Sequence, residues 1–191
     1  MYPIQMGDPG GLVERLSRRL AERTPRQADV PGYRQAAVLV PLLFKLGEPH
    51  LLFTQRTQHV ATHKGQVSFP GGVIEPQDAD AAAAALRETE EEIGVPARQV
   101  RILGRLDDHV TNTSGFVIAP FVSVIPADAP RLTSDLEVAR ILEVPLAFLL
   151  EEANREADEP TSRWRYLWPG APIWGATARI LEEFLSILEH A

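Results

Sequence analysis

An arginine and three of the four glutamates in residues 87–92 carry the strongest chemical signal in the sequence. Arg87, Glu88, Glu91 and Glu92 follow the letters FPGG and a run of five alanines, and a glycine comes shortly after them. Spacings of i,i+3 and i,i+4 place the three glutamates on one face of a helix. Because like charges at this spacing repel one another, the pattern predicts a cation among them, and carboxylate oxygens suit Mg²⁺ or Mn²⁺ better than zinc.

The opposite face of the same predicted helix is apolar, with Ala82, Leu86 and Ile93 at helical spacing. Acidic runs often lie simply in water, and a solvated face is the alternative explanation. The Gly-Gly loop before the helix and the adjacent Arg87 favour a cation site instead. The sequence therefore predicts a helix with one side in the core and the other in a functional site.

These residues resemble the Nudix box of the Nudix hydrolases, which reads R-E, two residues, E-E, one residue, G and an aliphatic residue. The matching positions are Gly72, Arg87, Glu88, Glu91, Glu92, Gly94 and Val95. The Gly-to-Arg spacing is one residue longer than in the common form. The acidic residue that the family usually has eight positions before the arginine falls on Ala79, between Asp78 and Asp80.

The resemblance implies hydrolysis of a diphosphate with the help of Mg²⁺ or Mn²⁺, which neutralises phosphoryl charge and activates a water molecule. The metal ligands that we expect are Glu88, Glu91, Glu92 and the carbonyl of Gly71. Arg87 is expected to orient a box carboxylate rather than to touch substrate. The general base stays open between Glu91, Glu92 and Glu137, which precedes a later predicted strand.

A second motif lies just upstream of the box, in LFTQRT at 52–57 and HKGQVS at 63–68. It resembles the extra motif of the coenzyme A diphosphatase branch of the family, L-L-T-x-R-S followed by H-x-G-Q, with Ala61 where the branch commonly has Arg. An arginine can make a forked contact with phosphate, and coenzyme A carries a 3′-phosphate besides its diphosphate. The substrate-binding residues that we expect are Arg56, His63, Lys64, Gln66, Thr113 and Ser114.

Composition limits the other possibilities. The chain has 191 residues, a formal net charge of -7 and no cysteine, which excludes disulfides and thiolate chemistry. An acidic chain is a poor general binder of nucleic acid, and no apolar run is long enough to span a bilayer. We therefore expect a cytoplasmic protein that binds a small-molecule substrate and neither nucleic acid nor membrane. Its oligomeric state stays open, with a homodimer as one option.

The order of predicted elements indicates an α+β fold. Residues 1–33 form an N-terminal extension with a short amphipathic helix and a linker, and residues 34–191 form the main domain. The strands are expected at 36–44, 51–54, 100–106, 116–125, 138–144 and 163–167, and the later helices at 146–150 and 176–188. Residues 47–49 are expected to turn, Pro120 to mark an edge strand or a bend, and 151–160 to form a loop. The resemblance implies a Nudix α/β/α sandwich with a mixed sheet, in which the box forms loop, helix and loop.

The sequence thus predicts a metal-dependent Nudix diphosphatase that cleaves coenzyme A or its thioesters to 3′,5′-ADP and a 4′-phosphopantetheine species. One alternative is a Nudix hydrolase of another nucleoside diphosphate derivative, such as ADP-ribose or a dinucleoside polyphosphate. Another is a non-catalytic Nudix domain that binds a nucleotide and regulates a partner. The three intact carboxylates favour an enzyme.

Overall fold

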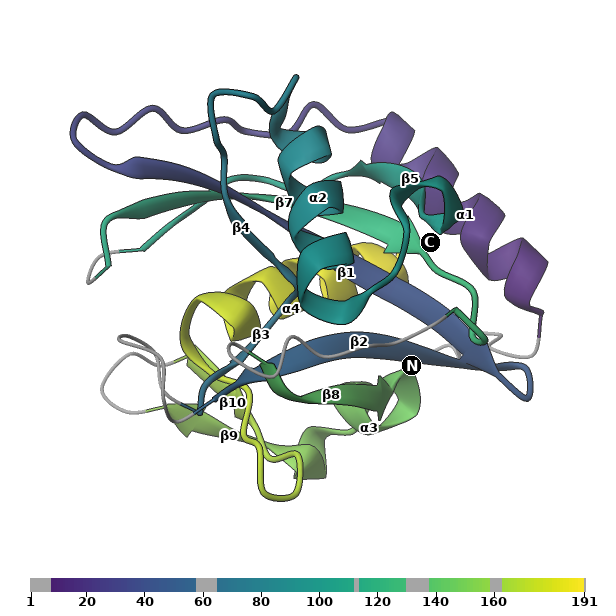
Figure 1. Cartoon of the computed structure of the whole chain (residues 1–191). Coiled ribbons are helices and arrows are strands. Elements are labelled where there is room, and N and C mark those ends of the chain that lie inside the picture. Colours follow the sequence, from purple (N-terminus) through teal and green to yellow (C-terminus); the bar gives the residue numbers. More distant parts are fainter. Residues whose placement is uncertain (1–7, 58–64, 112–113, 130–137, 159–162, 191) are drawn as a thin grey trace.

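A computed structural model describes residues 8–57, 65–111, 114–129, 138–158 and 163–190 (Figure 1). The helices are α1 (Pro9–Ala21), α2 (Ala81–Ile93), α3 (Leu146–Leu150) and α4 (Gly175–Glu189), with 3₁₀ turns at Ala97–Gln99 and Glu152–Asn154. The strands are β1 (Arg34–Lys45), β2 (Glu48–Arg56), β3 (Val67–Ser68), β4 (Gly71–Val73), β5 (Arg101–Arg105), β6 (His109–Val110), β7 (Phe116–Val124), β8 (Val138–Pro145), β9 (Arg155–Asp158) and β10 (Arg163–Tyr166). Among the described helices, none is long and apolar enough to cross a membrane.

A mixed sheet forms the centre of the molecule. Its main path runs β3-β2-β1-β7-β5, with β4 beside β1, β6 beside β7 and β8 beside β2. β1 and β7 are parallel, whereas the other pairs in this sheet are antiparallel. Strands β9 and β10 form a separate hairpin. The expected α+β architecture with a mixed sheet is confirmed.

Helices cover both faces of this sheet because the side chains of β1 alternate between two apolar environments. Ala37 and Leu39 pack in a cluster with Ala84 and Ala85 of α2. Residues Val40 and Leu42 point the other way, into a larger cluster that contains buried side chains of α1 and α4. Figure 1 shows α2 on one side of the long β1 strand and α4 on the other. The result is a three-layer α/β/α arrangement.

Helix α1 packs into the same cluster as α4. Leu12 and Leu16 are fully buried and Leu20 nearly so, all on one face of the helix. Gly104 in β5 permits this close approach, because a Cβ added there would lie 2.6 Å from the Cβ of Leu20. Arg23, just beyond the helix, forms ion pairs with Asp107 at 3.0 Å and Glu183 at 2.7 Å. The N-terminal helix is therefore tied to both β5 and α4.

Pro120 was expected at a sheet edge or a bend, but the structure places it inside β7, between β1 and the β5–β6 side. Its carbonyl accepts a hydrogen bond from Leu106 N–H, so its own nitrogen faces the gap between β5 and β6. The backbone N–H that proline lacks would therefore point at a place where no residue of a neighbouring strand accepts a hydrogen bond. This explains how a central strand tolerates proline.

Two other expectations were wrong in detail. The first turn lies at Leu46 and Gly47, whose φ angles are 52° and 85°, while Glu48 already pairs with Lys45. Positive φ at both central residues is typical of a two-residue hairpin turn. The acidic stretch expected to be a loop contains β9, whose side chains are mostly charged and give no apolar alternation. Its pairing with β10 makes it a strand.

Candidate functional site

Helix α2 is fixed at both ends by its own sequence. Asp80 caps the N-terminus by accepting a hydrogen bond from Ala83 N–H at 2.8 Å. Gly94 ends the helix at φ 70°, a left-handed conformation that favours glycine. Thr89 is buried and donates its hydroxyl to Ala85 O at 2.7 Å. These contacts hold the helix so that Arg87 and the glutamates face the β4 segment.

Arg87 is the organising cation of this face. Nε and Nη2 donate to the two carboxylate oxygens of Asp78, at 2.9 and 3.0 Å, and Nη2 also donates to Val73 O at 3.1 Å. Nη1 donates to Glu88 at 2.8 Å and to Glu91 at 3.3 Å. These five bonds match the five N–H donors of a guanidinium. Arg87 therefore orients carboxylates and has no donor left for a substrate.

The paired charges alter each other's ionisation. The hydrogen bonds from Arg87 lower the pKa of Asp78, helped by a backbone hydrogen bond from Glu75 N–H. The same bonds to Asp78, followed by the contact with Glu88, raise the pKa of Arg87 above its ordinary value. The Asp78 side chain is only 4% exposed, so this ion pair is a structural part of the site.

The two glycines before the helix lie directly against its carboxylates. A Cβ added at Gly72 would come within 2.5 Å of the Glu88 carboxylate, so only glycine leaves room for that side chain. Gly71 has φ 148°, where an added Cβ would also meet the Ala37 carbonyl at 2.3 Å. The N–H of Gly71 donates to Glu92 at 3.2 Å. The requirement for Gly-Gly is therefore steric and local.

The three glutamates differ in their surroundings. Glu92 is 6% exposed, the Glu88 side chain is 19% exposed and the Glu91 side chain is 61% exposed. In the described part of the chain, no three His, Cys, Asp or Glu side chains lie close enough together to form a metal cluster. Instead, Glu88 and Glu91 are turned toward Arg87. The glutamate carboxylates still suit a hard divalent cation, because their ligand atoms are oxygens. They lie against the backbone of Gly72, where a single added Cβ would fill the space beside Glu88.

A cleft of about 390 Å³ opens beside the two glycines. Three predicted substrate-binding residues line it, namely Arg56 at the end of β2, Gln66 and Ser114. The other lining residues are Arg34, Ala36, Val38, Val67, Ser68, Phe69, Gly71, Gly72, Val73, Thr111, Phe116, Ile118, Ala176 and Thr177. The fold thus brings the upstream motif, the glycines of the box and the loop after β6 to one surface.

Hydrogen bonds fix the walls of this cleft. Ser114 donates its hydroxyl to Thr111 Oγ1 at 2.9 Å, and Thr111 Oγ1 accepts from Phe116 N–H at 2.8 Å. Thr177 of α4 donates to Val67 O at 3.0 Å, which ties the helix to β3. Ser114 therefore uses its hydroxyl hydrogen within the loop, and its oxygen keeps the capacity to accept a hydrogen bond.

Some predicted residues lie outside the described part of the chain, namely His63, Lys64, Thr113 and Glu137. Conversely, the partner of Arg87 was not identified from the sequence. The usual family position falls on Ala79, whereas Asp78 makes the contact. The extra residue between Gly72 and Arg87 was the available signal, because an insertion shifts the position that reaches the arginine. Arg34, which also lines the cleft, was not predicted as a site residue, since it stands at the start of a strand far from both motifs.

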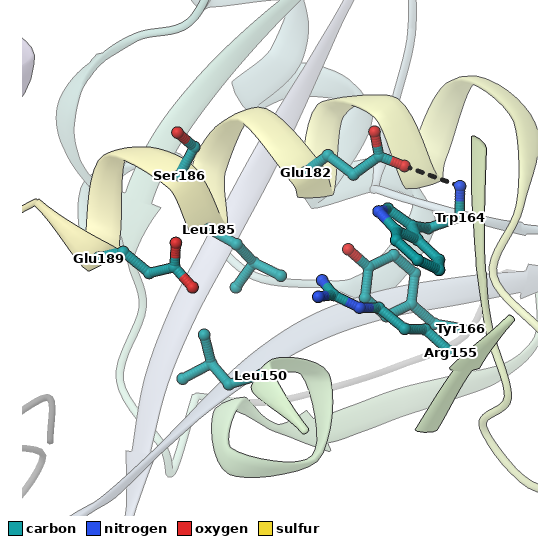
Figure 2. A pocket seen from close by; sticks show the side chains of 8 residues that line it. All are labelled: Leu150, Arg155, Trp164, Tyr166, Glu182, Leu185, Ser186 and Glu189. Atoms are coloured by element: carbon teal, nitrogen blue, oxygen red, sulfur yellow. Dashed lines mark hydrogen bonds between the residues drawn. The ribbon is translucent and has the colours of Figure 1, made fainter. Parts of the chain in front are cut away.

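A second cavity, of about 180 Å³, lies between α3, the β9–β10 hairpin and α4 (Figure 2). The guanidinium of Arg155 stacks over the Trp164 ring at 4.5 Å, and Glu182 accepts a hydrogen bond from Trp164 N–H at 3.2 Å. Burial raises the pKa of the Tyr166 phenol to about 12. No predicted site residue lines this cavity, whereas three of them line the cleft beside Gly71 and Gly72.

Comparison with known proteins identifies the family of the chain. Residues 33–165 match the family model of the NUDIX domain. The chain is 38% identical over 179 residues to a protein of Escherichia coli K12 described as the uncharacterized Nudix hydrolase NudL. That alignment covers 90% of this chain and 92% of the relative.

Solved structures resemble the fold at low sequence identity. One is an Ap4A hydrolase of C. elegans in a binary complex, with a TM-score of 0.57 and 17% identity, covering 83% of this chain and 99% of that one. Another is the NUDIX domain of Shewanella oneidensis NrtR with ADP ribose, with a TM-score of 0.56 and 15% identity, covering 90% and 97%. At such identities the likeness concerns the fold alone.

Proposed function

The chain belongs to the Nudix hydrolase family, whose members act on pyrophosphate bonds, and from this premise we propose that it hydrolyses the diphosphate of coenzyme A or of its thioesters. The products are 3′,5′-ADP and 4′-phosphopantetheine or its acyl derivative. One observation carries the proposal. Arg56 and Gln66 of the upstream motif line the same cleft as Gly71 and Gly72 of the box.

The cofactor in this proposal is Mg²⁺ or Mn²⁺, held by Glu88, Glu91, Glu92 and the carbonyl of Gly71. When bound, such a cation neutralises charge on the phosphoryl oxygens and acidifies a water molecule. The protein's own part is positioning. Arg87 holds Glu88 and Glu91, and the N–H of Gly71 holds Glu92. Arg56 supplies positive charge for the diphosphate in the cleft.

The hydrolysis needs one proton acceptor. The oxygen of water bonds to one phosphorus, the P–O bond to the bridging oxygen breaks, and the other phosphate leaves with that oxygen. Glu91 and Glu92 are the described candidates for the base that takes the proton from water. Glu91 has the greater solvent access, because its side chain is 61% exposed while Glu92 is 6% exposed. We therefore favour Glu91, with Glu137 as the third candidate outside the described residues.

Product analysis tests this proposal directly. The protein is incubated with Mg²⁺ or Mn²⁺ and, in separate reactions, with coenzyme A, ADP-ribose and a dinucleoside polyphosphate. We expect release of 3′,5′-ADP from coenzyme A, detected by ion-exchange chromatography and mass spectrometry. Turnover of only the other two substrates would replace the proposal with the alternative Nudix activity. Absence of turnover with all three would reject both.

A further inference from the structure

Arg34 presents a positive charge to the cleft in a defined position. It begins β1, lines the cleft and lies over the ring of Phe116, with 5.3 Å between the guanidinium carbon and the ring centroid. Within the described part of the chain, no carboxylate forms an ion pair with it. An aromatic ring attracts a guanidinium and holds its plane while leaving the N–H groups at its edge available to another partner.

The backbone around this stack is well fixed. Arg34 and Phe116 are direct neighbours in the parallel pairing of β1 with β7. The N–H of Arg34 donates to Gly115 O at 2.9 Å, and Thr111 holds Phe116 through both its N–H and its carbonyl. The sheet therefore fixes the backbone on both sides of the stack, while the Arg34 side chain itself is exposed and accessible to a ligand.

The stack of Arg34 on Phe116 lies at the start of β1, at a distance from Gly71 and Gly72 of the box. Arg34, Ala36 and Val38 alternate toward the cleft, and Val38 pairs with Gly71. With a rise of about 3.3 Å per residue, the Cα of Arg34 lies roughly 13 Å along β1 from the level of Gly71. A ligand that places its diphosphate beside Gly71 and Gly72 would need a second anionic group to use Arg34.

The charge of the cleft favours such a ligand. Its described lining contains two arginines, Arg34 and Arg56, and no aspartate or glutamate. Two separate cations on a chain with a net charge of -7 indicate local selection for an anionic ligand.

We propose that Arg34, held over Phe116, forms a subsite for a second phosphate of the substrate, separate from the diphosphate that is cleaved. On the proposed function, on which this inference rests, that group is the 3′-phosphate of coenzyme A. Arg34 then selects coenzyme A over its dephosphorylated form, whereas the residues of the box act on both.

The kinetic test compares coenzyme A with dephospho-coenzyme A for the wild type and for Arg34→Gln. We expect the substitution to lower kcat/KM for coenzyme A by about 10- to 100-fold, the scale for losing a hydrogen bond between charged groups. For dephospho-coenzyme A the change should stay within about 2-fold. Arg101→Gln is the control, since Arg101 is an exposed arginine of β5 that does not line the cleft. An equal loss for both substrates, or none, would overturn the subsite.

Equilibrium binding separates this inference from the proposed function. Isothermal titration calorimetry compares 3′,5′-ADP with 5′-AMP, which lacks the 3′-phosphate, and needs no turnover. We expect the wild type to prefer 3′,5′-ADP, and Arg34→Gln to lose most of that preference while keeping its affinity for 5′-AMP. If the wild type shows no preference, or if the variant keeps it, the subsite is rejected. If coenzyme A is not hydrolysed but the preference depends on Arg34, only the proposed function fails.

Discussion

The guanidinium of Arg87 binds both carboxylate oxygens of Asp78, with Nε to Oδ1 at 2.9 Å and Nη2 to Oδ2 at 3.0 Å. This bidentate pair leaves Nη1 directed toward Glu88 and Glu91 on the same helix. Asp78 therefore sets the direction of the guanidinium, and the guanidinium sets the direction of two carboxylates.

Asp78→Asn should weaken the response to metal without removing a predicted ligand. Asparagine can replace only part of the forked contact, so Arg87 and the glutamates lose their fixed orientation. We expect a rise of about 10- to 100-fold in the Mn²⁺ concentration for half-maximal activity, the usual effect of losing a residue behind a ligand. Direct Mn²⁺ titration by electron paramagnetic resonance checks the same change. Asp80→Asn is the matched control, because asparagine also caps helices; an equal response in both variants would contradict the positioning role.

The same pair should make stability depend on pH in acid. Arg87 lowers the pKa of Asp78 below the unfolded value of about 3.9. The ion pair therefore stabilises the fold above that pH, and the contribution is lost as the pH falls through the lowered folded pKa. Urea unfolding midpoints measured from about pH 5 to about pH 2.5 should fall less steeply for Asp78→Asn than for the wild type. Parallel curves would show that the pair does not contribute.

Glu91→Gln should reduce turnover by at least about 10²-fold with the fold intact, the scale for losing a general base or a critical electrostatic group. The matched control is Glu90→Gln on the same helix. Glu90 accepts a hydrogen bond from Ala97 N–H at 3.2 Å, outside the predicted site, and glutamine retains an acceptor oxygen. Steady-state rates and circular dichroism of both variants are compared. Near-normal turnover of Glu91→Gln would reject its proposed role.

Gly72→Ala should inactivate the site through Glu88. The new methyl group would lie within 2.5 Å of the Glu88 carboxylate, so that side chain must move away. We expect turnover to fall by about 10²-fold, comparable to losing the carboxylate itself. Gly10→Ala in α1 is the control, since its methyl would meet its nearest neighbour, an Asp8 oxygen, at an ordinary 3.6 Å. Full activity of Gly72→Ala would show that Glu88 is not needed in its observed place.

Leu16→Ala should destabilise the whole protein rather than free the N-terminal helix. Leu16 is fully buried in the cluster shared with α4, and such truncations cost about 2–5 kcal/mol in the free energy of unfolding. Arg18→Ala, on the exposed face of the same helix, should change it by less than about 0.5 kcal/mol. Chemical denaturation of both variants provides the measurement. An unchanged midpoint for Leu16→Ala would mean that α1 unfolds separately.

The sequence predicted the elements whose signals are local. The box helix follows from its alanines, the helical spacing of its apolar residues and its glycine stop, and β1 follows from a dense apolar run. Strand β9 escaped prediction because its residues are mostly charged, and pairing with β10 rather than burial defines it. The position of Pro120 was predicted wrongly because the lack of an N–H costs a hydrogen bond only on the side of the strand that the nitrogen faces. The sequence of one strand does not show which neighbour lies on that side.

The site was predictable to the extent that its chemistry is concentrated in motifs. Arg87 was expected to orient a carboxylate, and its hydrogen bonds do so. The role of Asp78 as the partner of Arg87 depends on how the chain accommodates one extra residue before Arg87, and spacing alone does not determine this. The position of Arg34 over Phe116 depends on the parallel pairing of β1 with β7, a contact between segments about eighty residues apart in the chain.

The packing of α1 against Gly104 affects which fragment of the chain keeps a complete hydrophobic core. The family model matches residues 33–165, yet α1 and α4, which both pack into the cluster on one face of the sheet, lie outside those limits. A fragment trimmed to the recognised segment would expose Val40 and Leu42 to water and would be prone to aggregate. The segment that the family model recognises is thus shorter than the segment that encloses the hydrophobic core.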